Sequence, residues 1–301
     1  MSNITKIISR SFDVVNSIWN ADKMILDNSC MPTTPNRVNL HYWDIAIEKK
    51  GKIPFNLGDN LAEIVVDYML SKKNLSLDAQ VHQTKHLYAV GSIINMGYQN
   101  ATIWGSGFLD DISDNFRRCI AHRPLFRKLD VRAVRGPYSR QTMLTLGHQC
   151  PEVYGDPVLL MPKIYQPHSI EKKYDYVVIP HFSMEEFWRK KIPSDIIVSM
   201  ITNDYKSVID KICSAKRVIS GSLHGIILSE SYGVPTIFLR DRCSNRDFKY
   251  NDYYSSTNRE KYIYACSIEE AINMKPMDLP NNLTTLQDGL INSFPYDLWE
   301  K

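Results

Sequence analysis

Short apolar runs and helical apolar patterns alternate along most of this chain, with glycine or polar residues between them. Strands are expected at Leu40–Ile45, Ala89–Ile93, Thr102–Trp104, Val131–Val134, Tyr176–Ile179, Ile196–Ile201, Arg217–Ser220 and Thr236–Leu239. Helices are expected at Leu61–Leu70, Pro137–Leu146, Tyr205–Ala215, Leu223–Tyr232 and Asn282–Leu298. Alternating strands and helices indicate an α/β protein whose parallel sheets carry helices on both faces.

The pattern falls into two blocks, which predicts two Rossmann-like domains. The segment Lys163–Lys173 is polar and contains a proline, so we expect the linker there. This gives a first domain at 37–166 and a second at 167–275. Residues 276–301 are expected to form a C-terminal helix that packs back on the first domain. Residues 1–36 form an N-terminal arm, in which residues 4–19 have apolar side chains at helical spacing.

Composition limits the classes of protein that remain. The 301 residues carry a net charge of only +3, which is too small an excess to indicate nucleic-acid binding. The chain has no apolar run long enough to span a membrane and no leader at its start, so we expect a cytoplasmic protein. Its six cysteines are scattered, which predicts reduced thiols and no metal site; they are Cys30, Cys119, Cys150, Cys213, Cys243 and Cys266.

The strongest candidate for chemistry is the turn Ser220–Gly225, where a strand ends and a helix begins. Ser222 is a good N-cap, and two small residues at the turn allow the backbone to approach a ligand. His224 lies in the first helical turn, where the helix dipole lowers its pKa and favours an anionic ligand. The alternative is an ordinary capped helix with a solvated histidine.

Further turns carry polar residues in similar places. Arg135 ends a strand and Arg140 lies one turn into the next helix, so both are candidates for pairing with a carboxylate or phosphate. In Asn56–Asn60, Asp59 and Asn60 either cap a helix or bind sugar hydroxyls.

Two weaker candidates lie near the same expected edge of the first sheet. Ser106 lies in a glycine-rich loop, Gly105–Gly107, that resembles a ligand loop. Asp156 follows the last strand of the first domain and is expected to face the interdomain cleft.

An ordered set of motifs resembles the polysaccharide pyruvyl transferases. The set is NLGDN, IWGSGF, VRAVRGPYSRQTMLTLG, YGDPVLLMP, IPHF and SGSLHGIILSESYGVPTIFL, and FKYNDYYSS at Phe248–Ser256 is a further match. Leu57 in the first motif and the run Arg240–Arg242 after the last one depart from the usual family pattern.

The resemblance implies an enzyme with a GT-B-like architecture and its active site in the cleft between the domains. Members move the enolpyruvyl unit of phosphoenolpyruvate onto two hydroxyls of one sugar, forming a pyruvate ketal and releasing phosphate. Phosphoenolpyruvate is a co-substrate, and neither a cofactor nor a metal is expected. The acceptor is expected to be a sugar of a cell-surface polysaccharide or its lipid-linked precursor, which would give the N-terminal arm a reason to touch the inner face of the plasma membrane.

Roles follow for the matched residues. His224 and the backbone at Ser222–Gly225 are expected to hold the donor, with His224 as acid, base or phosphate ligand. Arg135 is expected to be a second anion clamp, and both side chains are expected to face a solvent-lined cleft. Lys249 is expected to contact the donor, and His181, Arg140 and Ser106 are weaker candidates for substrate contacts. Asp59, Asn60 and Asp156 are expected either to contact the acceptor hydroxyls or to activate them.

Two other functions stay open. A nucleotide-sugar glycosyltransferase of the same architecture would need a carboxylate for the ribose, for which Glu230 is the available residue. A non-catalytic protein that binds glycans in envelope assembly is the other, although His224, Arg135 and Asp59 argue for a working site.

Overall fold

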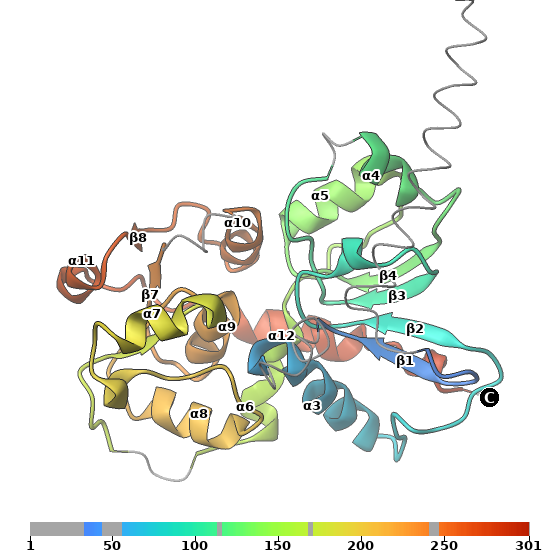
Figure 1. The fold of residues 1–301 in the computed structure, drawn as a ribbon. Helices are drawn as coiled ribbons and strands as arrows, with labels where there is room; N and C mark the ends of the chain where they lie inside the picture. Colours follow the sequence, from blue (N-terminus) through green and yellow to red (C-terminus); the bar gives the residue numbers. More distant parts are fainter. Residues whose placement is uncertain (1–32, 44–55, 113–115, 168–170, 241–246, 301) are drawn as a thin grey trace, which may run out of the picture.

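Two parallel four-stranded sheets form the frame of the protein (Figure 1). The computed structural model describes residues 33–43, 56–112, 116–167, 171–240 and 247–300. The first sheet has the order β1 (Val38–His41), β2 (Lys85–Tyr88), β3 (Ala101–Trp104) and β4 (Leu129–Ala133). The second has the order β5 (Val177–Ile179), β6 (Val218–Ser220), β7 (Thr236–Leu239) and β8 (Tyr264–Ala265). The prediction of an α/β protein with two parallel sheets is confirmed.

We call the part of the chain around the β1–β4 sheet the first unit and the part around the β5–β8 sheet the second unit. The helices of the first unit are explained by the spacing of their apolar residues and by the residues at their ends. In α3 (Leu57–Ser71), the apolar residues at 57, 61, 62, 65, 66, 69 and 70 recur at helical spacing and are all buried. The helix α5 (Pro137–Leu146) has proline at its first position and ends at Gly147, whose φ of 95° is the left-handed cap that glycine adopts most readily. The unit also contains α4 (Phe116–Ala121) and the 3₁₀ turn Ile94–Met96.

The second unit is built around α9 (Leu223–Ser231), which is apolar on nearly all sides. Seven of its residues are buried, from Leu223 through Glu230, as expected for a helix enclosed by protein. The second unit also contains α7 (Glu185–Arg189), α8 (Tyr205–Cys213), α10 (Asp247–Ser256) and α11 (Ile268–Asn273); α8 contacts α9, and α11 contacts β7 and β8. The 3₁₀ turn Pro157–Leu160 and α6 (Met161–Ile164) contact both α3 and α9, so one apolar core runs through both units.

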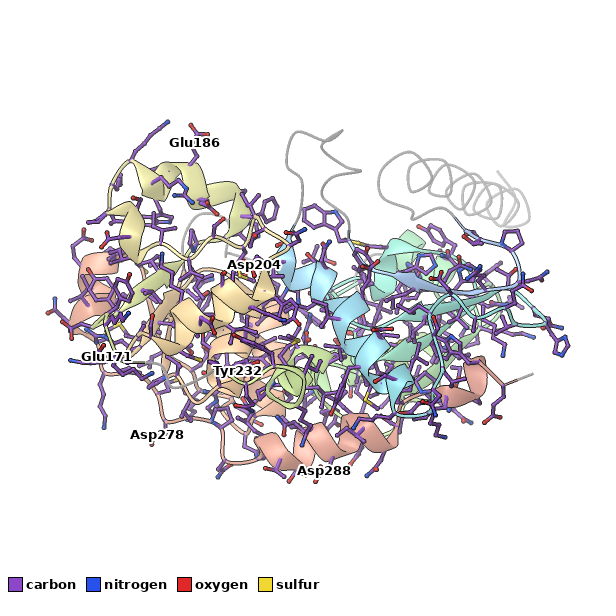
Figure 2. The ribbon with its side chains drawn as sticks, turned by 90° about the horizontal axis from the view of Figure 1, so that it is seen from below. Glu171, Glu186, Asp204, Tyr232, Asp278 and Asp288 are labelled. Carbon is purple, nitrogen blue, oxygen red and sulfur yellow. The ribbon has the colours of Figure 1, made fainter. Side chains whose placement is uncertain are left out.

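The end of the chain returns to the first unit. Trp104 donates from Nε1 to the carbonyl of Leu290 in α12 (Leu283–Asn292), at 2.9 Å. Lys85 donates to the carbonyl of Leu298 in the last 3₁₀ turn, Tyr296–Leu298, at 2.8 Å. Figure 2 shows α12 along one edge of the molecule, with Asp288 on its outer side.

Two predicted strands are wrong. The apolar run Ala89–Ile93 follows β2 as a loop, because Gly91 adopts φ +99° and a strand cannot continue through it. The run Ile196–Ile201 makes only one strand-like bridge, from Ile197 to Val178. Its apolar side chains are explained by burial in the core, where Val198 and Met200 are almost fully enclosed.

Several expectations concern residues outside the described ranges. The amphipathic helix at residues 4–19, part of the linker at 168–170 and part of the run Arg240–Arg242 lie there. Within the described ranges, no helix combines the length and the apolar character that crossing a bilayer requires. The four described cysteines, Cys119, Cys150, Cys213 and Cys266, are free thiols.

Candidate functional site

A pocket of about 530 Å³ lies where the carboxyl ends of strands from both sheets meet. Ligands of open α/β folds collect at this edge of a sheet. Its lining residues follow β1, β2, β3, β5 and β6, or belong to the start of α3 and to α10. They are Trp43, Asn56, Asp59, Ser92, Ile93, Met96, Leu109, His181, Phe182, Ser183, Ser222, Leu223, His224 and Lys249.

His224 is the second residue of α9 and contributes to the wall of the pocket. Ser222 caps the helix, since its Oγ accepts from the backbone N–H of Gly225 at 3.4 Å. Burial lowers the pKa of His224 to about 3, and the charges of Lys249 and Arg135 act in the same direction. The imidazole is therefore neutral at pH 7, which equips it to accept a proton or a hydrogen bond rather than to provide a fixed positive charge.

Two glycines of the sequence motifs allow this packing. A Cβ on Gly58 would lie 2.3 Å from Nδ1 of His224, so the first turn of α3 approaches the imidazole closely only with glycine there. A Cβ on Gly91 would lie 2.8 Å from Oδ1 of Asp59. The backbone of these glycines thus forms the tight packing around the two ionisable side chains.

Asp59 lies in the first turn of α3, buried and facing the pocket. Burial raises the pKa of Asp59 to about 7; the positive charge of Lys249 and a hydrogen bond from Asn56 oppose this rise, and the charge of Asp156 adds to it. A carboxyl group that titrates near neutral pH is suited to deliver a proton.

Asp156 lies behind His224. One carboxylate oxygen accepts from the backbone N–H of Val158 at 3.0 Å, and the other faces Nε2 of His224 at 3.7 Å. Burial raises the pKa of Asp156 to about 6. The side chain is fully buried and is not among the described residues that line the pocket. The structure therefore places the free oxygen of Asp156 toward the histidine and not at the surface of the pocket.

Three other predicted residues line the pocket. They are Ser222, His181 and Lys249. His181 shares a 2.8 Å hydrogen bond with Ser183 through Nδ1, and its ring lies against Phe182. Lys249 brings a positive charge near Asp59 and His224, as the pKa shifts of both residues show.

Arg135 does not face a solvent-lined cleft. Its side chain is fully buried, and its Nε donates to Asp252 at 3.0 Å. Its two other nitrogens donate to Oγ of Ser92, at 2.5 Å, and to the carbonyl of Phe108, at 2.6 Å. The second carboxylate oxygen of Asp252 accepts from the backbone N–H of Ser139 at 2.8 Å. The guanidinium therefore lies behind the pocket, where it positions the lining residue Ser92, and is not itself among the described lining residues.

Four further predicted contacts are not among the described lining residues. Ser106 is fully buried and donates to the carbonyl of Gly91 at 2.9 Å. Arg140 pairs with Glu152 and donates to the carbonyl of Cys150. Asn60 and Gly225 also lie outside the lining set.

Glu230 is not free to bind a ribose. It is 2% exposed and forms an ion pair with Arg259 at 2.6 Å. It also accepts hydrogen bonds from Tyr253 and Thr236. The residue that a nucleotide-sugar enzyme of this type would use is therefore committed to the core.

Sequence reasoning missed other parts of the site. Asn56 lies in the NLGDN motif and Ser92 in the expected strand Ala89–Ile93, and nothing in the sequence shows which of such short polar residues faces a ligand. Asp252 lies in the FKYNDYYSS match, and its partner Arg135 is 117 residues away. Trp43 lies within the expected strand Leu40–Ile45 and Phe182 within the IPHF motif, and neither position marks the aromatic ring as a ligand contact. In the described part of the chain, no group of three or more histidine, cysteine or acidic side chains is arranged to hold a metal ion.

Comparisons with known proteins identify the family of this chain. The sequence model of the polysaccharide pyruvyl transferase family matches residues 56–241. The chain belongs to this family. It is 25% identical over 230 residues to the uncharacterized protein L143 of Acanthamoeba polyphaga mimivirus, which covers 71% of this chain and 75% of that protein. It is 26% identical over 211 residues to the succinoglycan biosynthesis protein ExoV of Rhizobium meliloti (strain 1021), covering 66% of this chain and 60% of that protein. No solved structure gives a significant match.

Proposed function

We propose that the protein transfers the enolpyruvyl group of phosphoenolpyruvate to two hydroxyls of a sugar, forming a pyruvate ketal and releasing phosphate. The family match supports the reaction class, and it includes Asp59, Asp156 and His224. The similarity to a succinoglycan biosynthesis protein supports a sugar of a cell-surface polysaccharide, or its lipid-linked precursor, as the acceptor. A GT-B-like arrangement with its active site between the two units is part of the same proposal, supported by a pocket lined from both.

The reaction adds a proton to the donor and removes one proton from each of the two sugar hydroxyls. A proton is added to carbon 3 of the donor, which becomes a methyl group, while carbon 2 becomes electrophilic. A sugar hydroxyl bonds to carbon 2 and loses its proton, and the carbon 2–phosphate bond breaks. The second hydroxyl then bonds to carbon 2 and loses its proton, which is taken up by the departing phosphate.

The single observation that carries the proposal is the convergence of Asp59, His224 and Lys249 on one pocket. Asp59 is protonated part of the time at neutral pH, so we assign it the proton delivered to carbon 3. Neutral His224, with Asp156 behind it, accepts the proton of the attacking hydroxyl. Lys249 and the N-terminal end of α9 attract the anionic groups of the donor.

The test measures phosphate released from phosphoenolpyruvate with lipid-linked and soluble oligosaccharide acceptors, and the mass of each acceptor afterwards. We expect acceptor-dependent release and a mass gain of one pyruvate less one water. Asp59→Asn and His224→Ala should each reduce turnover roughly a hundredfold or more, and His82→Ala, on the exposed surface, should not. Transfer of a hexose from a nucleotide sugar instead, without consumption of phosphoenolpyruvate, would contradict the proposal.

A further inference from the structure

An aromatic cluster forms a second chemical environment in the pocket. Trp43 and Phe182 have ring centroids 5.2 Å apart, and the ring of Phe182 lies 4.5 Å from that of His181. Ser183 completes the cluster through its hydrogen bond to His181. All four side chains line the pocket. Phe182, His181 and Trp43 are half-buried, which leaves part of each ring accessible, unlike the fully buried rings of Trp104 and Tyr250.

The cluster is assembled from both units at equivalent places. Trp43 follows β1, the first strand of one sheet, and Phe182 follows β5, the first strand of the other. The contact between the two rings therefore joins the carboxyl-end edges of the two sheets. A ligand held there touches both units at once.

The chemistry of the cluster differs from that of Asp59, His224 and Lys249. None of its four members is a lysine, arginine or acid, so it offers little to the charged ends of phosphoenolpyruvate. An aromatic face carries partial negative charge and attracts the C–H bonds that line one face of a pyranose ring. The hydroxyl of Ser183 and the imidazole of His181 can exchange hydrogen bonds with the hydroxyls at the rim of such a ring.

The size of the pocket leaves room for this second ligand. Its volume of about 530 Å³ lies within the range of pockets that enclose ligands much larger than a three-carbon phosphate ester. A donor held beside Lys249 and His224 leaves the aromatic part of the pocket to its reaction partner.

We propose that Trp43, His181, Phe182 and Ser183 form the subsite that holds a pyranose ring of the acceptor, with Phe182 as its stacking platform. This inference rests on the proposed function for the identity of the ligand as an acceptor. It assigns the substrate class of this part of the pocket and the residues that select it.

The first test measures sugar binding without the donor, by saturation-transfer NMR with a panel of methyl hexopyranosides. We expect at least one of them to receive saturation at its ring C–H protons from the wild-type protein. Phe182→Ala and Phe182→Leu should abolish the signal, because leucine replaces apolar volume but not the aromatic face, and Phe182→Tyr should retain it. Phe187→Ala is the matched control, since Phe187 is a 42% exposed phenylalanine of the same unit outside the lining set.

The second test separates the subsite from the reaction. With an accepted oligosaccharide, Phe182→Ala should raise the acceptor KM roughly tenfold and leave the KM for phosphoenolpyruvate unchanged. Equal sugar signals in wild type and Phe182→Ala, no signal from any hexoside, or an unchanged acceptor KM would overturn the subsite. Ring-dependent sugar binding in a protein that never consumes phosphoenolpyruvate would keep the subsite and overturn the proposed function.

Discussion

Nε2 of His224 faces Oδ2 of Asp156 at 3.7 Å, and neither atom has a hydrogen-bond partner among the described residues. Two buried polar atoms without hydrogen-bond partners cost free energy, and here the two atoms face each other. A small movement of the imidazole would bring them into hydrogen-bond contact. Asp156 would then fix a proton on Nε2 and leave Nδ1 of the neutral ring as the acceptor.

This relationship predicts the acid limb of the pH profile. Because Asp156 titrates near pH 6, protonation below that value should remove its charge from behind His224, and kcat should fall. Asp156→Asn should lower kcat roughly 10- to 100-fold and abolish the limb near pH 6. The exposed residue Asp288 supplies the control, Asp288→Asn. An unchanged acid limb in Asp156→Asn would show that another group sets it.

Lys249 should set the position of the alkaline limb. Its positive charge opposes the burial that raises the pKa of Asp59 to about 7. Removing this charge should raise the pKa further, so Lys249→Met should move the alkaline limb of kcat to higher pH while it raises the KM for phosphoenolpyruvate. The exposed Lys261 provides the control, Lys261→Met. An alkaline limb at the same pH in Lys249→Met would show that Asp59 is not the group that delivers the proton.

Asp59 should make stability depend on pH in a way that needs no substrate. In the folded protein its carboxyl stays protonated up to about pH 7, whereas in the unfolded chain it ionises near 3.8. Between these values the unfolded state binds fewer protons, so the free energy of unfolding falls as pH rises. Asparagine does not ionise, so the free energy of unfolding of Asp59→Asn should not fall in this way. It should exceed that of the wild type by on the order of 2–4 kcal/mol at pH 8 and differ little from it at pH 4.

Denaturant unfolding at several pH values measures that difference. Asp67→Asn, an exposed substitution on the same helix, should show no such trend. A constant offset between Asp59→Asn and wild type from pH 4 to pH 8 would contradict the raised pKa.

Arg135 should matter for folding more than a surface arginine does. Removing one partner of a buried ion pair leaves the other charged and enclosed, at a cost of about 3–5 kcal/mol. Arg135→Ala should lower the free energy of unfolding by that amount, and a double-mutant cycle with Asp252→Ala should show strong coupling. Arg140→Ala, which breaks a more exposed pair with Glu152, should cost about 1 kcal/mol or less. Additive effects at Arg135 and Asp252 would rule out the coupling.

Local signals in the sequence were sufficient for some parts of this structure. Pro137 and Gly147 mark the ends of α5, and Ser222 caps α9, because a helix end is determined by residues a few positions apart. His224 and Asp59 were placed at the pocket because strand ends and helix starts of parallel sheets converge. The α/β class follows from the same alternation.

Long-range contacts determined what the sequence did not show. Arginine is usually exposed, and only the fold brings Asp252 across 117 residues to enclose Arg135. An apolar run such as Ile196–Ile201 has the same composition whether it pairs as a strand or fills a core. Asp156 was assigned to the acceptor because a sequence does not show which way a buried oxygen points.

The return of α12 to the first unit means that the polypeptide crosses between the two units twice. One crossing precedes β5, and the other precedes Leu283, after which Leu290 and Leu298 are tied to Trp104 and Lys85. Two covalent tethers allow fewer relative motions of the two units than one, and the apolar core that runs through both units restrains those motions further.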